Sequence, residues 1–223
     1  MKKTVIPLLI ILFFSIRIFS QTNENVTIQE GIKNYSQSLQ KGLDNLIDIN
    51  QISDFGWTGI VQSGILNKAT TNIKGSRIVT DICQSGEANI ADINIQGSYN
   101  GSNASPVSVL QLGIGNEAYI SIHGKGNKSR VYQYGSENNV EISQKGKRNE
   151  GEVDIIGDEN TGLIKILGDL NKYDVDIHGS FNMFSISQIN GFGNTAIIQL
   201  LTDHNGVSIV QNGMNNNVTM IQQ

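Results

Sequence analysis

Cysteine, proline and aromatic residues are scarce in this chain. Its 223 residues include one Cys, two Pro and 6% aromatics, and only 38% are hydrophobic. A single cysteine, Cys83, excludes a disulfide within the chain, and so few apolar residues predict a thin core. The 24 glycines argue against a helical bundle, because a glycine inside a helix costs about 1 kcal/mol relative to alanine. Strands joined by tight turns fit this composition better.

The sequence also lacks a run of basic residues. Its formal net charge is −4, and it becomes −7 when Lys2, Lys3 and Arg17 are removed with the first twenty residues. Because phosphate binding needs a clustered basic surface, we expect no nucleic-acid partner.

The first twenty residues, MKKTVIPLLIILFFSIRIFS, combine a basic start, an apolar run and a small residue, Ser20. This pattern is typical of a secretory signal peptide over residues 1–20, and it predicts cleavage near Ser20 and an extracellular protein. A retained membrane anchor is the alternative, although the uninterrupted apolar stretch is shorter than the about 18 residues that a spanning helix needs. Residues 21–28 then form a short lead.

From residue 29 to residue 223 one unit of eleven residues recurs. Its beginning reads Q-x-G-x-x-N, as in QLGIGN, QYGSEN and QKGKRN, and it fits seventeen registers. The third position is Gly in all but two registers and the sixth is Asn in all but two. Five extra residues near 101–106 (GSNASP) predict a loop insertion, and QINGFGN carries one extra residue.

The glycine and asparagine positions predict turns. Glycine adopts positive φ without a Cβ penalty, and asparagine tolerates the left-handed region while its amide binds the local backbone. The predicted turn glycines are Gly31, Gly42, Gly64, Gly86, Gly97, Gly113, Gly124, Gly135, Gly146, Gly157, Gly168, Gly179, Gly191 and Gly213.

The segments between these turns alternate and are rich in Val, Ile, Ser and Thr, which predicts short strands. Counting back in twos from Gln111 gives Val109 and Val107, so this face is the core; the other face carries residues such as Glu141 and Asp154. Strand, turn, strand and turn take 22 residues. The prediction is therefore an all-β protein, a β-solenoid of about eight 22-residue coils with two facing, parallel, in-register sheets.

Equivalent residues of successive coils should lie above one another, so that Gln stacks on Gln and Asn on Asn. A buried amide needs such a partner, because an unmatched one costs about 1–3 kcal/mol. The predicted stacking residues are Gln29, Gln40, Gln51, Gln62, Gln84, Gln111, Asn116, Gln133, Asn138, Gln144, Asn149, Gln211, Asn216 and Gln222.

An end coil lacks a neighbour on one side, and neither end of the repeat region has a helix, a proline-rich segment or a charge cluster to cover it. We therefore expect another copy to supply the missing layer, which gives a fibre with strands perpendicular to its axis.

The units QLGIGNEAYISI, QYGSENNVEISQ and QNGMNNNVTMIQ resemble the curlin repeat of bacterial curli subunits, and similar spacing covers residues 24–223. The resemblance implies a secreted functional amyloid for adhesion and biofilm, made of this chain and other curlin-like subunits. An outer-membrane secretion pore and a surface nucleator are implied partners. The Gly- and Asn-rich leader usual in the family is missing from QTNENVTI, and charged units such as KILGDLN are atypical. Major subunit, minor subunit and nucleator all remain open.

Two other classes of protein are compatible with a solenoid. A carbohydrate-active parallel β-helix enzyme would need acids or bases converging in one groove, whereas Asp154, Asp174 and Asp176 are explained by solvation. A surface-binding solenoid would need one uniform outward column, and the column through Tyr132 and Lys165 is mixed. We expect no catalytic, cofactor-binding or metal-binding residues. His123, His178 and His204 are read as surface histidines, and Trp57 as a packing residue rather than an adhesive one.

Overall fold

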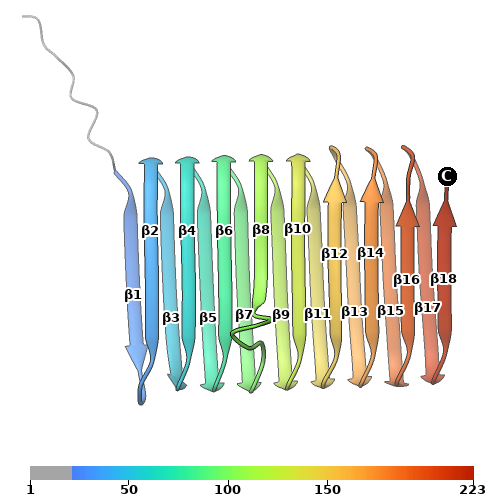
Figure 1. Cartoon of the computed structure of the whole chain (residues 1–223), viewed down its shortest axis with the longest axis horizontal. Coiled ribbons are helices and arrows are strands. Elements are labelled where there is room, and N and C mark those ends of the chain that lie inside the picture. Colours follow the sequence, from blue (N-terminus) through green and yellow to red (C-terminus); the bar gives the residue numbers. More distant parts are fainter. Residues whose placement is uncertain (1–21) are drawn as a thin grey trace, which may run out of the picture.

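A computed structural model describes residues 22–223 as two parallel β-sheets of nine strands each (Figure 1). The predicted signal peptide therefore lies outside the described residues. Odd-numbered strands form one sheet and even-numbered strands the other, so the chain alternates between them. Within the described part, no helix has the length and apolarity to cross a membrane. The predicted β-solenoid with parallel, in-register sheets is confirmed.

The odd-numbered sheet contains β1 (Glu24–Glu30), β3 (Leu46–Asp54), β5 (Lys68–Ser76), β7 (Ile90–Ser98), β9 (Glu117–Lys125), β11 (Asn139–Lys147), β13 (Thr161–Asp169), β15 (Met183–Phe192) and β17 (Gly206–Met214). The even-numbered sheet contains β2 (Tyr35–Leu43), β4 (Trp57–Ile65), β6 (Val79–Glu87), β8 (Val107–Ile114), β10 (Lys128–Ser136), β12 (Glu150–Ile156), β14 (Lys172–His178), β16 (Thr195–Leu200) and β18 (Asn217–Gln222).

Each pair of consecutive strands forms one coil, from coil 1 (β1 and β2) to coil 9 (β17 and β18). Nine coils are one more than expected, because β1 begins at Glu24, within the segment read as a lead, and because the unfinished unit at Gln222 forms β18. We call the turns after odd strands edge I and those after even strands edge II. The two edges lie on opposite sides of the molecule, at the bottom and top of Figure 1.

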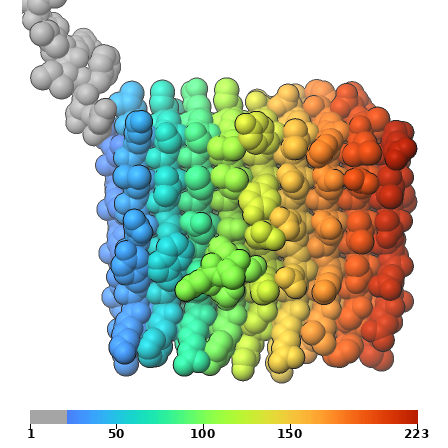
Figure 2. All heavy atoms as spheres, viewed as in Figure 1, coloured from blue at the N-terminus to red at the C-terminus, as the bar shows by residue number. Residues whose placement is uncertain are grey.

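The loop at 101–106 leaves the register of the stack unchanged. Gln84 still pairs with Gln111 across it, and the loop projects from the face of the even sheet (Figure 2). A bridge between Ser102 and Ser105 closes the loop. The predicted insertion thus adds a surface feature without breaking the coil.

The core lies between the sheets and consists of the predicted inward column. Val107, Val109 and Gln111 are each at most 1% exposed, while Glu141 on the opposite face is exposed. Two large aromatic rings fit only because a glycine stands in the neighbouring coil. A Cβ on Gly151 would lie 2.2 Å from Tyr173, and one on Gly162 would lie 2.0 Å from Phe184.

The extra residue in QINGFGN is absorbed inside β15 as a bulge. Gln188, rather than Ile189, occupies the buried column and pairs with Gln211. Gly191 lacks the positive φ expected of a turn glycine, which Asn190 (φ 53°) has instead. Gly191 is required for space, since a Cβ there would lie 2.3 Å from Nδ2 of Asn194.

Candidate functional site

Coils stack through the two faces that each turns toward its neighbours in the stack. The third-position glycines set how closely neighbouring coils approach. Apart from Gly191, all the predicted turn glycines have positive φ. Their missing side chain also faces the next layer. A Cβ on Gly113 would lie 1.8 Å from the carbonyl oxygen of Gly135, far inside van der Waals contact.

The prediction that asparagine shares the left-handed position is wrong. The left-handed residue is the one immediately before the asparagine, such as Glu137 (φ 56°) or Phe181 (φ 60°). Asn138 itself is completely buried. Its amide binds the backbone, as expected, but it does so across layers.

Asparagines inside a stacked row join three successive coils, with Asn182 as an exception because its Nδ2 has no partner within residues 22–223. The backbone N–H and Nδ2 of Asn116 donate to Oδ1 of Asn89 in the preceding coil at 3.1 and 3.0 Å, and its Nδ2 also donates to the carbonyl oxygen of Gly135 in the following coil at 2.7 Å. On edge II this ladder is continuous from Asn23 to Asn205. On edge I it runs from Asn100 to Asn216, after Gly56 and Ile78 interrupt the column.

A glutamine ladder runs beside the asparagines of edge II. Nε2 of Gln111 donates to Oε1 of Gln133 at 2.9 Å, and Oε1 of Gln111 accepts from Nε2 of Gln84 at 2.8 Å. Gln40, Gln62, Gln84, Gln111 and Gln133 form one unbroken row. On the odd sheet Gln29 pairs with Gln51, and Gln211 with Gln188, a ladder residue that the sequence reading missed.

The ladders break where the column changes to an aliphatic residue. Gln144 stands between Ile122 and Ile166, and Gln222 follows Leu200, so neither stacks on glutamine. Buried amide atoms without a partner occur at these changes: Nε2 of Gln51, and Oε1 of Gln144, Gln188 and Gln222. The ladder is thus directional, with Nε2 donating toward the C-terminal end.

Gln111→Leu should cost about 2–4 kcal/mol of unfolding free energy, because it removes a donor from Gln133 and an acceptor from Gln84. Gln144→Leu, the comparison variant, should cost about 1 kcal/mol less than Gln111→Leu, because its loss of the bonds to Tyr173 and to the carbonyl of Lys128 is offset by removing an unpaired Oε1 and joining Ile122 to Ile166. Guanidinium unfolding of both variants measures the difference. Equal losses would contradict a stabilising ladder.

The two ends of the stack differ. In the described chain no strand covers the outer side of β17 or β18, and the inward Met220 is 40% exposed whereas Ile198 beneath it is 0% exposed. A Cβ on Gly213 would meet only Nδ2 of Asn216, at 3.8 Å. The C-terminal end therefore presents an open apolar layer with room for a close backbone.

Coil 1 at the other end has a polar interior. Asn25 and Thr27 replace the inward isoleucines of β3, and Ser36 and Ser38 point inward from β2. Three of them bond to one another, Asn25 to Ser38 and Thr27 to Asn25. Coil 1 can consequently face either water or another layer with these three side chains paired.

Carboxylates on the sheet faces are partly desolvated. Burial raises the pKa of Asp81 and of Asp92 above the ordinary carboxyl value. Burial also raises the pKa of Asp154, and repulsion from Asp176 on the adjacent strand adds to it. A folded chain that binds these protons at higher pH than the unfolded chain is stabilised by acid.

The free energy of unfolding should therefore rise as the pH falls from 7 toward the ordinary carboxyl range of about 4, and this gain should be lost as the pH rises through the raised pKa values. Asp154→Asn should stabilise the chain at pH 7 and reduce its gain on acidification. Thermal melts across this pH range, with the exposed Asp174→Asn as control, measure the effect. A wild-type melting temperature that falls between pH 7 and pH 5 would contradict it.

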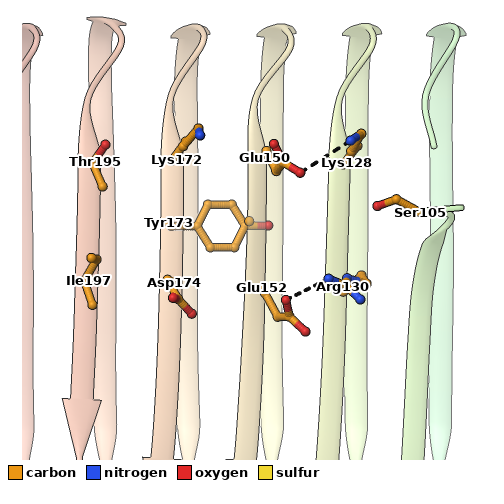
Figure 3. Close-up of a pocket in the computed structure, with 11 residues that line it drawn as sticks. Ser105, Lys128, Arg130, Glu150, Glu152, Lys172, Tyr173, Asp174, Thr195 and Ile197 are labelled. Atoms are coloured by element: carbon orange, nitrogen blue, oxygen red, sulfur yellow. Dashed lines mark hydrogen bonds and ion pairs between the residues drawn. The ribbon is translucent and has the colours of Figure 1, made fainter. Parts of the chain in front are cut away.

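A shallow groove of about 270 Å³ lies on the even sheet beside the 101–106 loop (Figure 3). Two ion pairs line it: Lys128 lies 3.4 Å from Glu150, and Arg130 lies 2.9 Å from Glu152. Lys172 and Asp174 line the groove as well. The hydroxyl of Tyr173 bonds to Ser129 and Gln144, and burial raises its pKa.

The remaining candidate residues lie apart. His123 is on edge I, whereas His178 and His204 are on edge II, and His178 lies 3.1 Å from Asp176. Residues 22–223 contain no group of His, Cys, Asp and Glu that could hold a metal ion. Trp57 packs over its own strand, since a Cβ on Gly59 would lie 2.5 Å from its ring. Burial raises the pKa of the half-buried Cys83 thiol.

Comparison with protein-family models and with curated proteins finds no match for this chain.

Proposed function

We propose that this protein is a structural subunit of a secreted, curli-like fibre that serves surface adhesion and biofilm formation. The coil is the unit of assembly, and a layer from another molecule continues the stack. The observation that carries this proposal is the C-terminal end, where β17 and β18 have no strand on their outer side among residues 22–223 and Met220 stays exposed.

The direction of the ladders supports addition at this end. The N–H and Nδ2 of Asn216 donate to Oδ1 of Asn194, so its own Oδ1 is left as the acceptor for a following layer. In a second copy Asn34 holds the equivalent place in coil 1, and Gln29 holds the place that follows Gln211. Coil 1 of one molecule thus fits coil 9 of another in the register used inside the chain.

A second role within the same fibre is favoured by the polar interior of coil 1. If Asn25, Thr27, Ser36 and Ser38 face water, coil 1 is the blunt start of a fibre and only coil 9 accepts a layer, from this chain or from another curlin-like subunit. The chain would then initiate or end a fibre rather than repeat along it.

Assembly from the unfolded state tests the proposal. The purified chain is diluted from denaturant at neutral pH, and the lag before thioflavin fluorescence is measured with and without preformed fibres. We expect self-seeding and a meridional reflection at about 4.7–4.8 Å. A chain that remains a soluble monomer with and without seeds would contradict the proposed function.

A further inference from the structure

The two edges of the solenoid carry opposite charge. At the fourth and fifth positions of the repeat, which form the tips of the turns, edge I has five basic residues and edge II has six acidic residues without Lys or Arg, counted over the described coils. All eleven side chains are exposed. The fold therefore gathers a basic row that the linear sequence does not show.

The charges also fall in the same coils. Edge I carries Lys33 in coil 1, Arg77 in coil 3, Lys125 in coil 5 and Lys147 with Arg148 in coil 6. Edge II carries Asp44 in coil 1, Glu87 in coil 3, Glu137 in coil 5 and Asp158 with Glu159 in coil 6. Coil 6, which has two basic residues on edge I, also has two acidic residues on edge II.

The coils between them match in apolar character. Edge I has Phe55, Tyr99 and Leu170 in coils 2, 4 and 7, and edge II has Leu66, Ile114 and Phe181 in the same coils. Each of these side chains is at least 39% exposed. Charged and apolar coils thus follow one another in the same order along both edges.

Three carboxylates lack a cationic counterpart in their own coil, and each, like Asp158, accepts a backbone N–H of the preceding coil. Asp54, Asp169 and Asp203 accept the backbone N–H of Ile32, Lys147 and Ser180 in the preceding coil, at 2.7–2.8 Å. Opposite them on the other edge stand uncharged residues: Leu66, Phe181 and Phe192. No coil brings like charges of the two edges together.

Contacts within one molecule do not explain this match. Strands of nine residues hold the two edges roughly 30 Å apart, and none of the ion pairs in residues 22–223 involves the edge residues. On edge I the cations are held by aromatic rings instead, with Arg77 5.8 Å from the ring of Phe55 and 5.0 Å from that of Tyr99. This leaves the basic row ordered and its charge available to a partner.

We propose that edge I of one copy docks against edge II of a second copy lying side by side, parallel and at the same height. Both copies have the same spacing between coils, so a match in one coil is a match in all. A shift by one coil leaves only one of the four cationic coils opposite an acid. Reversing one copy so that coil 3 faces coil 6 still places three of the four cationic coils opposite acids, but it leaves Lys125 opposite Ile114 and Tyr99 opposite Glu137, whereas the parallel arrangement matches every cationic coil. This lateral contact does not depend on end-to-end stacking.

Charge reversal in coil 3 tests the partner and the register. Self-association is measured by sedimentation at about 20 mM and about 0.5 M NaCl, where the Debye length changes from roughly 20 Å to 4 Å. Arg77→Glu and Glu87→Arg should each weaken association at low salt at least tenfold, and the two together should restore it to within about threefold. Combining Arg77→Glu with Glu159→Arg, which restores only the reversed arrangement, should not.

The measurement is repeated with Gly213→Ala, which leaves no room for a layer on coil 9, so that a failure of end stacking is distinguished from a failure of lateral docking. Unchanged unfolding midpoints verify that the exposed edge variants are folded. Absence of salt-dependent association, rescue by Glu159→Arg, or salt-dependent binding of a polyanion such as polyphosphate in place of a second copy would each overturn the proposal.

Discussion

Gly113→Ala is expected to destabilise the protein by about 3–4 kcal/mol, a large effect for a single methyl group. The added Cβ would lie 1.8 Å from the carbonyl oxygen of Gly135. Both groups are backbone or fixed to it, so no side-chain rotation relieves the contact, and coils 4 and 5 must separate. Overpacking of this kind costs about 1–3 kcal/mol or more, and the positive φ of 134° adds about 1 kcal/mol.

Gly115→Ala separates these two causes. Gly115 also has positive φ (65°), but the nearest atom to an added Cβ is Cγ of Glu137 at 3.6 Å, an ordinary contact. We expect a loss of about 1 kcal/mol, from the backbone conformation alone. Guanidinium unfolding of the two variants makes the comparison. Similar losses would mean that glycine is needed for its conformation and not for close stacking.

Gly213→Ala is expected to fold and yet to stop fibre growth. Inside the chain its Cβ meets only Nδ2 of Asn216, at 3.8 Å. In a fibre the carbonyl oxygen of Gly31 from the next copy would take the place that Gly135 takes above Gly113, about 2 Å from that Cβ. A penalty of about 3 kcal/mol corresponds to a loss of more than a hundredfold in binding the next layer.

Gly206→Ala is the matched control, in the same strand β17. Nothing lies within 4 Å of a Cβ at Gly206, and the equivalent position in β15 already carries Met183. Seeded growth of this variant should equal that of wild type. The free energy of unfolding of both variants should stay within about 1 kcal/mol of the wild-type value. Normal growth of Gly213→Ala would remove coil 9 as the site of addition.

Sequence periodicity was sufficient to predict the coil, the parallel sheets and the inward column through Val109 and Gln111. Those features follow from local alternation and from one spacing that holds throughout the repeats. The same reasoning located the 101–106 loop, because extra residues must leave a stack whose layers are in register. It placed one coil too few, since the strand before Gln29 has no signature of its own.

The left-handed residue of each turn could not be predicted, because its side chain varies from Glu137 to Phe181. Its conformation does not require the asparagine that usually follows it, since Phe55 and Arg77 have the same positive φ before Gly56 and Ile78. Whether Gln188 or Ile189 enters the column was also ambiguous, because one extra residue can be absorbed on either side of a bulge. The structure decides for Gln188, which bonds to Oε1 of Gln211 at 2.8 Å.

The matched edges could have been found in the sequence. Their signal is the sign of charge at the fourth and fifth positions, taken separately for alternate units. Lys33 and Asp44 are eleven residues apart in the chain, and Arg77 and Glu87 are ten apart, but the two residues of each pair lie on opposite edges of the same coil. Averaging over all units mixes the two rows and cancels their charges.

Disulfide trapping tests the stacking of one molecule on another most directly. Ile32→Cys and Met214→Cys are introduced together with Cys83→Ser; both positions are exposed tips of edge I, in coils 1 and 9. Within one molecule they lie eight coils apart, roughly 38 Å, too far for a disulfide. Between stacked copies they lie about 4.8 Å apart, inside the range that a disulfide needs.

The account predicts a reducible ladder of covalent multimers after oxidation of the assembled protein. The control pair Ile114→Cys with Met214→Cys, one tip on each edge, should give none above background. Monomers alone, or multimers no more abundant than in the control pair, would contradict the claim that coil 1 of one copy completes coil 9 of another.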